Sequence, residues 1–209
     1  MSEPKVMYDL RICNYGTPAS AEDDNVAASQ RVDLITGYAG TAETDNTITL
    51  DAIAARLEAP RNLVVTFTAG GGLTGGYLRA YGLGIKGEPV SELFTYVTSA
   101  AAITGNVPFV TVDRISIWGC TGTIAAGDVV KVGIGAKLGL PMGSDCEIDR
   151  VVREWSNNVD LVVAESSLNR TYGTYAATLN TPCELWYVVK RTLRWQLFDD
   201  KEDLKWVLF

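Results

Sequence analysis

Residues 132–141 read Val132-Gly133-Ile134-Gly135-Ala136-Lys137-Leu138-Gly139-Leu140-Pro141, and they close a region, beginning at Arg61, in which short β-branched runs alternate with glycine clusters. The main runs of this region span residues 63–68, 77–81, 109–118 and 129–132. Each run is bounded by Gly, Pro, Asn or Asp, which is the pattern of strands that end in turns. The region therefore predicts packed antiparallel β-structure and an all-β fold.

Further strands are expected on both sides of this region. At the start of the chain Val6, Tyr8, Leu10 and Ile12 recur at every second position, which places them on one face of a strand over residues 5–13. The other expected strands are residues 31–36, 46–50, 90–97, 147–155, 159–164, 175–179 and 184–195. Short strands at regular spacing are typical of an antiparallel β-sandwich or a jelly-roll-like domain.

Helical structure is expected to be minor, with at most one or two short helices. Residues 51–57 favour one of them, with Asp51 as its N-cap and Pro60 as its stop. Residues 14–30 are rich in Ala, Ser, Asp, Asn and Gly and show little apolar periodicity, so they are interpreted as an exposed loop or arm. The expected organisation is a strand and arm over residues 1–30, a β-sandwich over 31–194 and an aromatic tail over 195–209.

Composition and charge limit the partners. The 209 residues are 47% hydrophobic and 21% charged. No apolar run approaches the roughly 18 residues that a membrane span needs, so no membrane partner is expected. The first residues lack the basic start and apolar stretch of a secretory signal, which favours a cytosolic site of synthesis. With 25 acidic and 18 basic side chains the net charge is −7, which repels a phosphate backbone, so no nucleic-acid partner is expected.

The side chains available for chemistry argue against an enzyme. The chain contains no histidine, which removes Ser-His and Cys-His catalysis and imidazole metal ligation but leaves carboxylate or lysine chemistry open. Its four cysteines, Cys13, Cys120, Cys146 and Cys183, are scattered without a C-x-x-C pair. Such spacing does not predict a metal site, and in a reducing compartment it favours buried free thiols. We therefore expect no catalytic residues, no metal and no cofactor.

Two glycine-rich segments resemble phosphate-binding motifs only superficially. Residues 82–87 match G-x-G-x-x-G, but Glu88-Pro89 follows at once and a strand is expected next, so the helix that this motif requires is missing. Residues 70–76 lack the lysine that reaches phosphates and are better explained as a connection between strands. Residues 169–171 match a glycosylation pattern and are interpreted as a surface loop.

Part of the chain resembles small β-rich virion proteins of tailed bacteriophages. The likeness rests on residues 61–67, on the closing stretch 126–141, and on residues 173–175 and 184–188. It covers somewhat under half of the chain. It implies a structural protein of the virion, most simply a capsid decoration or cement protein, made in the host cytoplasm, whose partners are the major capsid protein and further copies of itself. It supplies no catalytic residues.

Under this resemblance the two ends of the chain are arms that reach adjacent subunits. The apolar C-terminal tail would be unfavourable in water unless it packs, either on its own core or on a neighbour. Aromatic residues are common anchors of interfaces. The expected partner-contact residues are Trp195, Phe198, Trp206, Phe209, Val6 and Tyr8.

Two alternatives remain open at this level. A neck or tail component of the phage would share the fold and differ only in the assembly that it joins. A carbohydrate-binding β-sandwich would use exposed aromatic rings, for which the candidates are Trp118, Trp155, Trp186 and Tyr187. Such side chains on half-buried strands more often belong to a core.

Overall fold

The predicted all-β antiparallel fold is confirmed, and the architecture is sandwich-like. A computed structural model describes residues 5–35, 43, 46–70, 72–97, 102–142, 146–195 and 206–207. In these residues the helical elements are three 3-10 turns, η1 (Val32–Leu34), η2 (Ala52–Ala55) and η3 (Glu165–Ser167). The strands are β1 (Lys5–Asn14), β2 (Ala27–Arg31), β3 (Arg61–Ala69), β4 (Leu73–Leu83), β5 (Pro89–Val97), β6 (Ala102–Thr104), β7 (Thr111–Gly122), β8 (Asp128–Gly139), β9 (Cys146–Ser156), β10 (Val159–Leu161), β11 (Leu168–Asn169), β12 (Thr174–Ala176), β13 (Cys183–Trp195) and β14 (Trp206–Val207).

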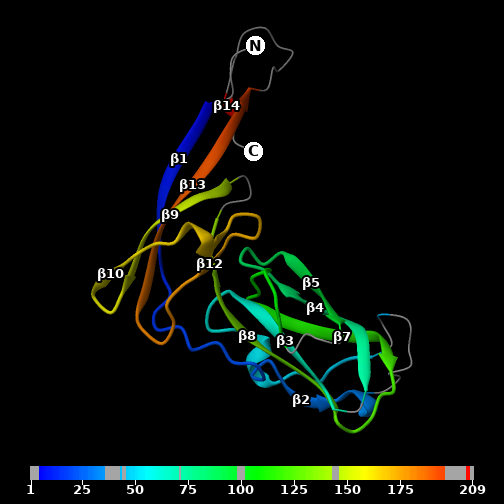
Figure 1. The fold of residues 1–209 in the computed structure, drawn as a ribbon. Coiled ribbons are helices and arrows are strands. Elements are labelled where there is room, and N and C mark those ends of the chain that lie inside the picture. Colours follow the sequence, from blue (N-terminus) through cyan, green and yellow to red (C-terminus); the bar gives the residue numbers. More distant parts are fainter. Residues whose placement is uncertain are drawn as a thin grey trace.

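The strands form three antiparallel sheets. Sheet A has the order β1-β13-β9-β10, with β14 also paired to β13. Sheet B has the order β11-β12-β8-β3-β6, with β2 also paired to β8, and sheet C has the order β5-β4-β7. Figure 1 shows sheets B and C together as the body of the molecule, while β1 and β13 project from it as a long ribbon.

The larger core lies between sheets B and C. Strands β3 and β8 of sheet B contribute alternate residues to it, and strands β4, β5 and β7 contribute the opposing layer. Its fully buried members include Leu63, Val65, Val130, Val132, Leu78, Ala80 and Ile115. This alternation is what the β-branched runs of the sequence predicted.

A second core joins sheet A to the end of sheet B. From sheet A it takes Leu185, Tyr187 and Val189 of β13, and from sheet B it takes Leu138 and Tyr175. Strand β8 therefore reaches both cores, because its residues up to Ile134 pack in the larger core and Leu138 packs in the second.

Two expected strands are absent from the described residues. The strand predicted over 31–36 is wrong, since β2 ends at Arg31 and Val32–Leu34 form η1. Val32 and Ile35 are both buried, and a spacing of three residues suits a 3-10 turn better than a strand. Within residues 46–50 the ladder is limited to one bridge, from Thr47 to Ser116.

The helix expected over residues 51–57 is only the short turn η2. Asp51 makes no capping bond to that turn. Instead, its Oδ2 accepts a hydrogen bond of 2.7 Å from the backbone N–H of Ala28 on β2. The carboxylate thus stabilises a contact between separate segments, which local sequence spacing does not reveal.

The prediction of an exposed loop over residues 14–30 is wrong for the later part of this segment. Val26 and Ala27 are fully buried, and β2 begins at Ala27. The backbone N–H groups of Glu22 and Val26 donate to the carbonyls of Ile134 and Val132, at 3.1 and 3.0 Å. This segment therefore packs along β8.

Candidate functional site

Strand β1 lies on the projecting ribbon (Figure 1), and an exposed apolar stripe runs along it. It consists of Val6, Tyr8, Leu10 and Ile12, whose exposed fractions are 43%, 59%, 56% and 54%. These residues recur at every second position, so they share one face of the strand. We refer to the face of sheet A that carries the apolar stripe as its outer face.

The outer face continues across β13 and β9. Residues directly opposite each other on antiparallel strands project from the same face. Ile12 lies opposite Trp186 of β13, which in turn lies opposite Arg153 of β9, and Leu10 lies opposite Val188. The apolar stripe is thus the edge of a broader surface that mixes apolar and charged side chains.

Arg153 organises the aromatic part of this surface. Its guanidinium carbon lies 4.2 Å from the ring centroid of Trp155 and 5.1 Å from that of Trp186, and its side chain also pairs with Asp160. The Trp186 indole N–H donates to Glu184 at 2.6 Å. Cation–π contacts of this kind hold the guanidinium against the rings. The ring faces that it covers are not open to a stacked sugar.

The other aromatic candidates for sugar binding are engaged as well. Trp118 stacks on Tyr77 with ring centroids 5.7 Å apart, and Tyr187 is buried in the second core. These contacts use the rings for packing, as their place on half-buried strands predicts.

The inner face of sheet A is closed toward the body. Tyr187 and Val189 of β13 point into the second core. Farther along the ribbon the inner face carries Asp9, whose Oδ2 lies 3.5 Å from Nε of Arg191. Met7, on the same inner face near the end of the ribbon, is 43% exposed. The inner face is therefore closed only near the body, whereas the outer face of β1 is exposed from Val6 to Ile12.

The outer edge of β1 is also available within the described part of the chain, where no strand pairs with it. Its ladder with β13 runs without a register shift from Lys5–Leu193 to Asn14–Glu184. The backbone N–H of Tyr15 donates to the Cys183 carbonyl at 2.9 Å. Odd-numbered residues of β1 are therefore the ones that form hydrogen-bonded pairs with β13. Even-numbered residues of β1 consequently direct their N–H and C=O groups away from β13, toward the free edge.

Two of the six predicted contact residues, Val6 and Tyr8, lie in the apolar stripe. The prediction omitted Leu10 and Ile12, which belong to the same stripe. Their alternation with Val6 and Tyr8 was visible in the sequence, but their exposure was not. It depends on which face of sheet A meets the second core.

The other four predicted contacts lie in the aromatic tail. Trp195 and Trp206 are paired through their backbones in the ladder between β13 and β14. Phe198 and Phe209 lie outside the described residues.

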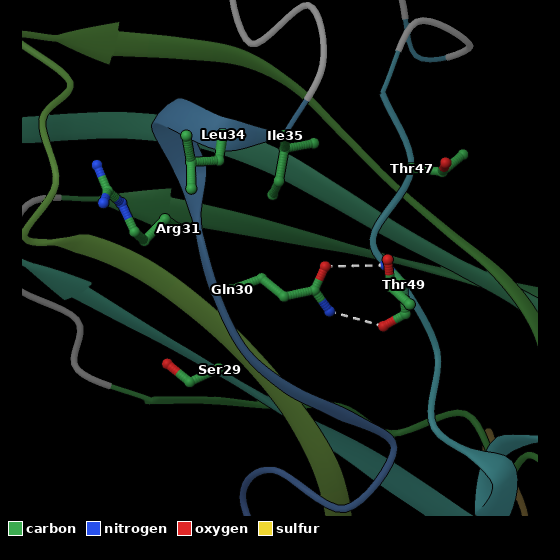
Figure 2. A pocket seen from close by; sticks show the side chains of 7 residues that line it. All are labelled: Ser29, Gln30, Arg31, Leu34, Ile35, Thr47 and Thr49. Atoms are coloured by element: carbon green, nitrogen blue, oxygen red, sulfur yellow. Dashed lines mark hydrogen bonds between the residues drawn. The ribbon is translucent and has the colours of Figure 1, made fainter.

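A separate hollow of about 440 Å³ lies beside β2 (Figure 2). The Gln30 amide spans part of it, accepting from the backbone N–H of Thr49 at 3.0 Å and donating to the Thr49 carbonyl at 2.6 Å. Arg31, also in the lining, pairs with Asp33 at 2.6 Å. The residues that line the hollow are Ser29, Gln30, Arg31, Leu34, Ile35, Thr47 and Thr49. The hydrogen bonds of Gln30 hold β2 against the segment that carries Thr49. Among the described lining residues there is no carboxylate or cysteine side chain.

The four cysteines are free thiols, and two of them, Cys146 and Cys183, are buried in the second core. Burial raises the pKa of the Cys183 thiol to about 12 and that of Cys120 to about 11. Both thiols are therefore protonated at neutral pH, and a protonated thiol is a poor nucleophile and metal ligand.

The described residues contain no group of three or more Cys, Asp or Glu side chains placed to hold a metal ion. Among the same residues, no helix combines the length and apolar character that a membrane crossing requires.

Fold and surface together define an all-β protein with a projecting ribbon, and within the described part of the chain the outer face and the edge of that ribbon are open. No protein-family model matches the chain, and neither a curated protein nor a solved structure is significantly similar to it.

Proposed function

We propose that this chain is a structural protein of a phage particle, a capsid decoration or cement protein that bridges subunits of the major capsid protein. The observation that carries the proposal is the apolar stripe on the projecting ribbon. Four large apolar side chains in a row on one exposed face are characteristic of a surface that binds another protein. The resemblance of residues 61–67 and 126–141 to phage virion proteins supports the choice of partner.

In this function the body and the ribbon have different tasks. The body, with its two sheets packed on a closed core, is a rigid support. The ribbon adds reach, because β1 and β13 extend away from that support (Figure 1). Burial of the outer face would contribute roughly 25 cal/mol for each Å² of apolar area, before the losses of freedom on binding are subtracted. Many copies on one shell multiply such modest contacts.

The first test counts this chain in purified particles by quantitative mass spectrometry, relative to the major capsid protein. Copy numbers near parity with the capsid protein support the decoration role. A copy number per particle that fits one ring would instead assign the chain to the neck or tail. Absence from the particle would overturn the proposal.

A second test asks whether the ribbon makes the contact. Purified particles that lack the chain are mixed with the Leu10→Ser/Ile12→Ser variant, which makes the apolar stripe polar. We expect its binding to fall at least tenfold relative to the natural chain, because two exposed apolar anchors are lost. The matched control, Leu34→Ser/Val162→Ser, changes one Leu and one exposed β-branched residue that lie off the ribbon. Equal loss in both variants would contradict a role of the stripe.

A further inference from the structure

We infer that the free edge of β1 pairs with β1 of a second copy of this chain, antiparallel and with Leu10 at the two-fold axis. The pairing would join two copies of sheet A into one continuous sheet. This inference refines the proposed function, since it names a partner for the same ribbon.

The first argument is that β1 lacks most of the usual protection of an edge strand, since its two central charges, Asp9 and Arg11, are confined to the inner face. Natural edge strands are commonly short, bulged, interrupted by proline or charged on their exposed face. Strand β1 spans ten residues with no proline and no register shift against β13. From Val6 to Ile12 its outer-face side chains are all apolar, and its even-numbered residues direct backbone donors and acceptors at the free edge. Such an edge pairs readily with another strand.

The second argument is charge complementarity, which selects the register. With Leu10 opposite Leu10 of the second copy, Asp9 of each copy lies opposite Arg11 of the other. A two-fold interface makes this pair twice. A register centred on Asp9 would place two carboxylates opposite each other, and one centred on Arg11 would oppose two guanidinium groups. Opposite charges stabilise directly paired positions of a sheet, and like charges destabilise them.

The third argument is that the same register joins the two apolar stripes. Tyr8 of each copy comes to lie opposite Ile12 of the other, and Leu10 lies opposite its own counterpart. All of these residues are on the outer face. Their backbone groups are also those directed at the free edge, so hydrogen bonding and side-chain pairing agree on one arrangement. The dimer would present both outer faces on one side, as a wider surface for the shell.

The test begins with the isolated chain. Sedimentation equilibrium over a concentration series is expected to show a monomer–dimer equilibrium. Leu10→Lys places two like charges at the axis and should make the chain monomeric, whereas Leu34→Lys, an exposed leucine away from the ribbon, should leave the equilibrium unchanged. A natural chain that stays monomeric, or a dimer that survives Leu10→Lys, would overturn the inference.

Charge reversal tests the register. Asp9→Arg opposes two pairs of like charges and is expected to raise the dimer dissociation constant about tenfold or more. Adding Arg11→Asp restores opposite charges with their signs exchanged, so the double variant should regain most of the affinity. Circular dichroism of each variant checks that the fold is retained. A double variant no tighter than Asp9→Arg alone would contradict this register.

Cross-linking gives an independent readout, because it detects the formation of a dimer and not the weakening of one. In a hydrogen-bonded antiparallel pair the Cα atoms are about 5.5 Å apart, which lies within the range that a disulfide spans. Leu10→Cys should therefore form a covalent dimer under mild oxidation, with the bond mapped between the two introduced thiols. Asp9→Cys should do so much more slowly, and the natural chain, with its own four cysteines, provides the baseline.

The two proposals can fail separately. A monomer in solution would overturn the pairing of β1 and leave the particle count unaffected, whereas absence from particles would overturn the virion role and leave the dimer measurement standing.

Discussion

Arg61 is the largest charged side chain in the interior, and its side chain is 0% exposed. Its guanidinium donates to the Gly135 carbonyl through Nε at 2.9 Å and to the Ala19 carbonyl at 3.1 Å, and it pairs with Glu58 at 2.6 Å. Burial lowers the pKa of Arg61, and the contact with Glu58 opposes that change. A charge in this position is tolerated because nearly every donor has an acceptor.

We expect Arg61→Met to lower the free energy of unfolding by about 3 kcal/mol, because buried carbonyls left without donors each cost roughly 1–3 kcal/mol. The apolar stem of methionine fills much of the same space, so the loss reports mainly on the polar contacts. Urea unfolding measures it, with Arg56→Met at an exposed position as the control. Equal stability of the two variants would show that these contacts contribute little.

Glu92 gives the fold a pH dependence of identifiable sign. Its two carboxylate oxygens accept from the backbone N–H groups of Asn106 and Val107 at 2.6 and 3.2 Å. Burial nevertheless raises the pKa of Glu92, and these bonds and Lys137 only partly offset it. A raised pKa in the folded state means that the folded chain holds this proton more tightly than the unfolded chain. The stability that it contributes is full below the unfolded pKa and is lost as the pH rises through the folded pKa.

The Glu92→Gln variant cannot ionise at this position. The free energy of unfolding of the natural chain minus that of the variant should therefore decrease as the pH rises through the acidic range above the usual glutamate value of about 4.3. Thermal or urea unfolding at several pH values gives this difference, and NMR titration of the Glu92 carboxyl gives its pKa directly. A difference that increases with pH would mean that the two N–H bonds outweigh burial.

At the scale of elements, the strands were predictable where the local alternation of buried and exposed residues is enough to define a strand. Val64 and Thr66 alternate with buried Leu63 and Val65, between Pro60 on one side and the glycines of residues 70–76 on the other, and the strand predicted there is β3. The failures occur where distant contacts decide. Val32–Leu34 form a turn because Val32 and Ile35 must both reach the core, and that requirement depends on where the sheets lie in the fold.

The candidate site was predictable to the same extent. The alternation in β1 was enough to place Val6 and Tyr8 on one face. The exposure of this face and the edge position of β1 both follow from its pairing with β13, which lies near the opposite end of the chain. Local patterns in a sequence carry no information about such a pairing, so the edge could not be located beforehand.

Gly133 shows how closely one element approaches another. A Cβ atom at this position would overlap the carbonyl oxygen of Glu22, in the segment that packs along β8. The position of a Cβ atom is fixed by the backbone of Gly133, and the carbonyl belongs to the backbone of Glu22, so neither can rotate away. We expect Gly133→Ala to lower the free energy of unfolding by about 1–3 kcal/mol, as overpacking of a rigid site does. Hydrogen exchange should also show faster exchange of the Glu22 and Val26 amides.

The control for this prediction lies on the same strand. Ala136→Ser changes an exposed position of β8 and should leave the exchange of these amides unchanged. If Gly133→Ala retained both the stability and the protection of the segment, the segment would not be held tightly against β8 in solution.

For the whole molecule, the arrangement of the two cores raises the question of whether they unfold together. The larger core is enclosed by sheets B and C, and the second core joins sheet A to the end of sheet B. Strand β8 runs through both, with Val132 in the larger core and Leu138 in the second. One strand thus connects the two cores, although its ladder with β3 has an irregularity between the Leu63–Ile134 and Arg61–Leu138 pairs. Because β8 contributes to both cores, we expect the second core and the larger core to unfold together.

Cavity variants in each core test this coupling. Leu78→Ala in the larger core and Leu185→Ala in the second each remove a fully buried side chain, and each should lower the free energy of unfolding by about 2–5 kcal/mol. If β8 couples the cores, either variant lowers hydrogen-exchange protection in both β4 and β13, whereas Leu34→Ala on the surface lowers it in neither. Loss of protection confined to the mutated core would mean that the two cores open independently, and the ribbon could then unfold while the body stays intact.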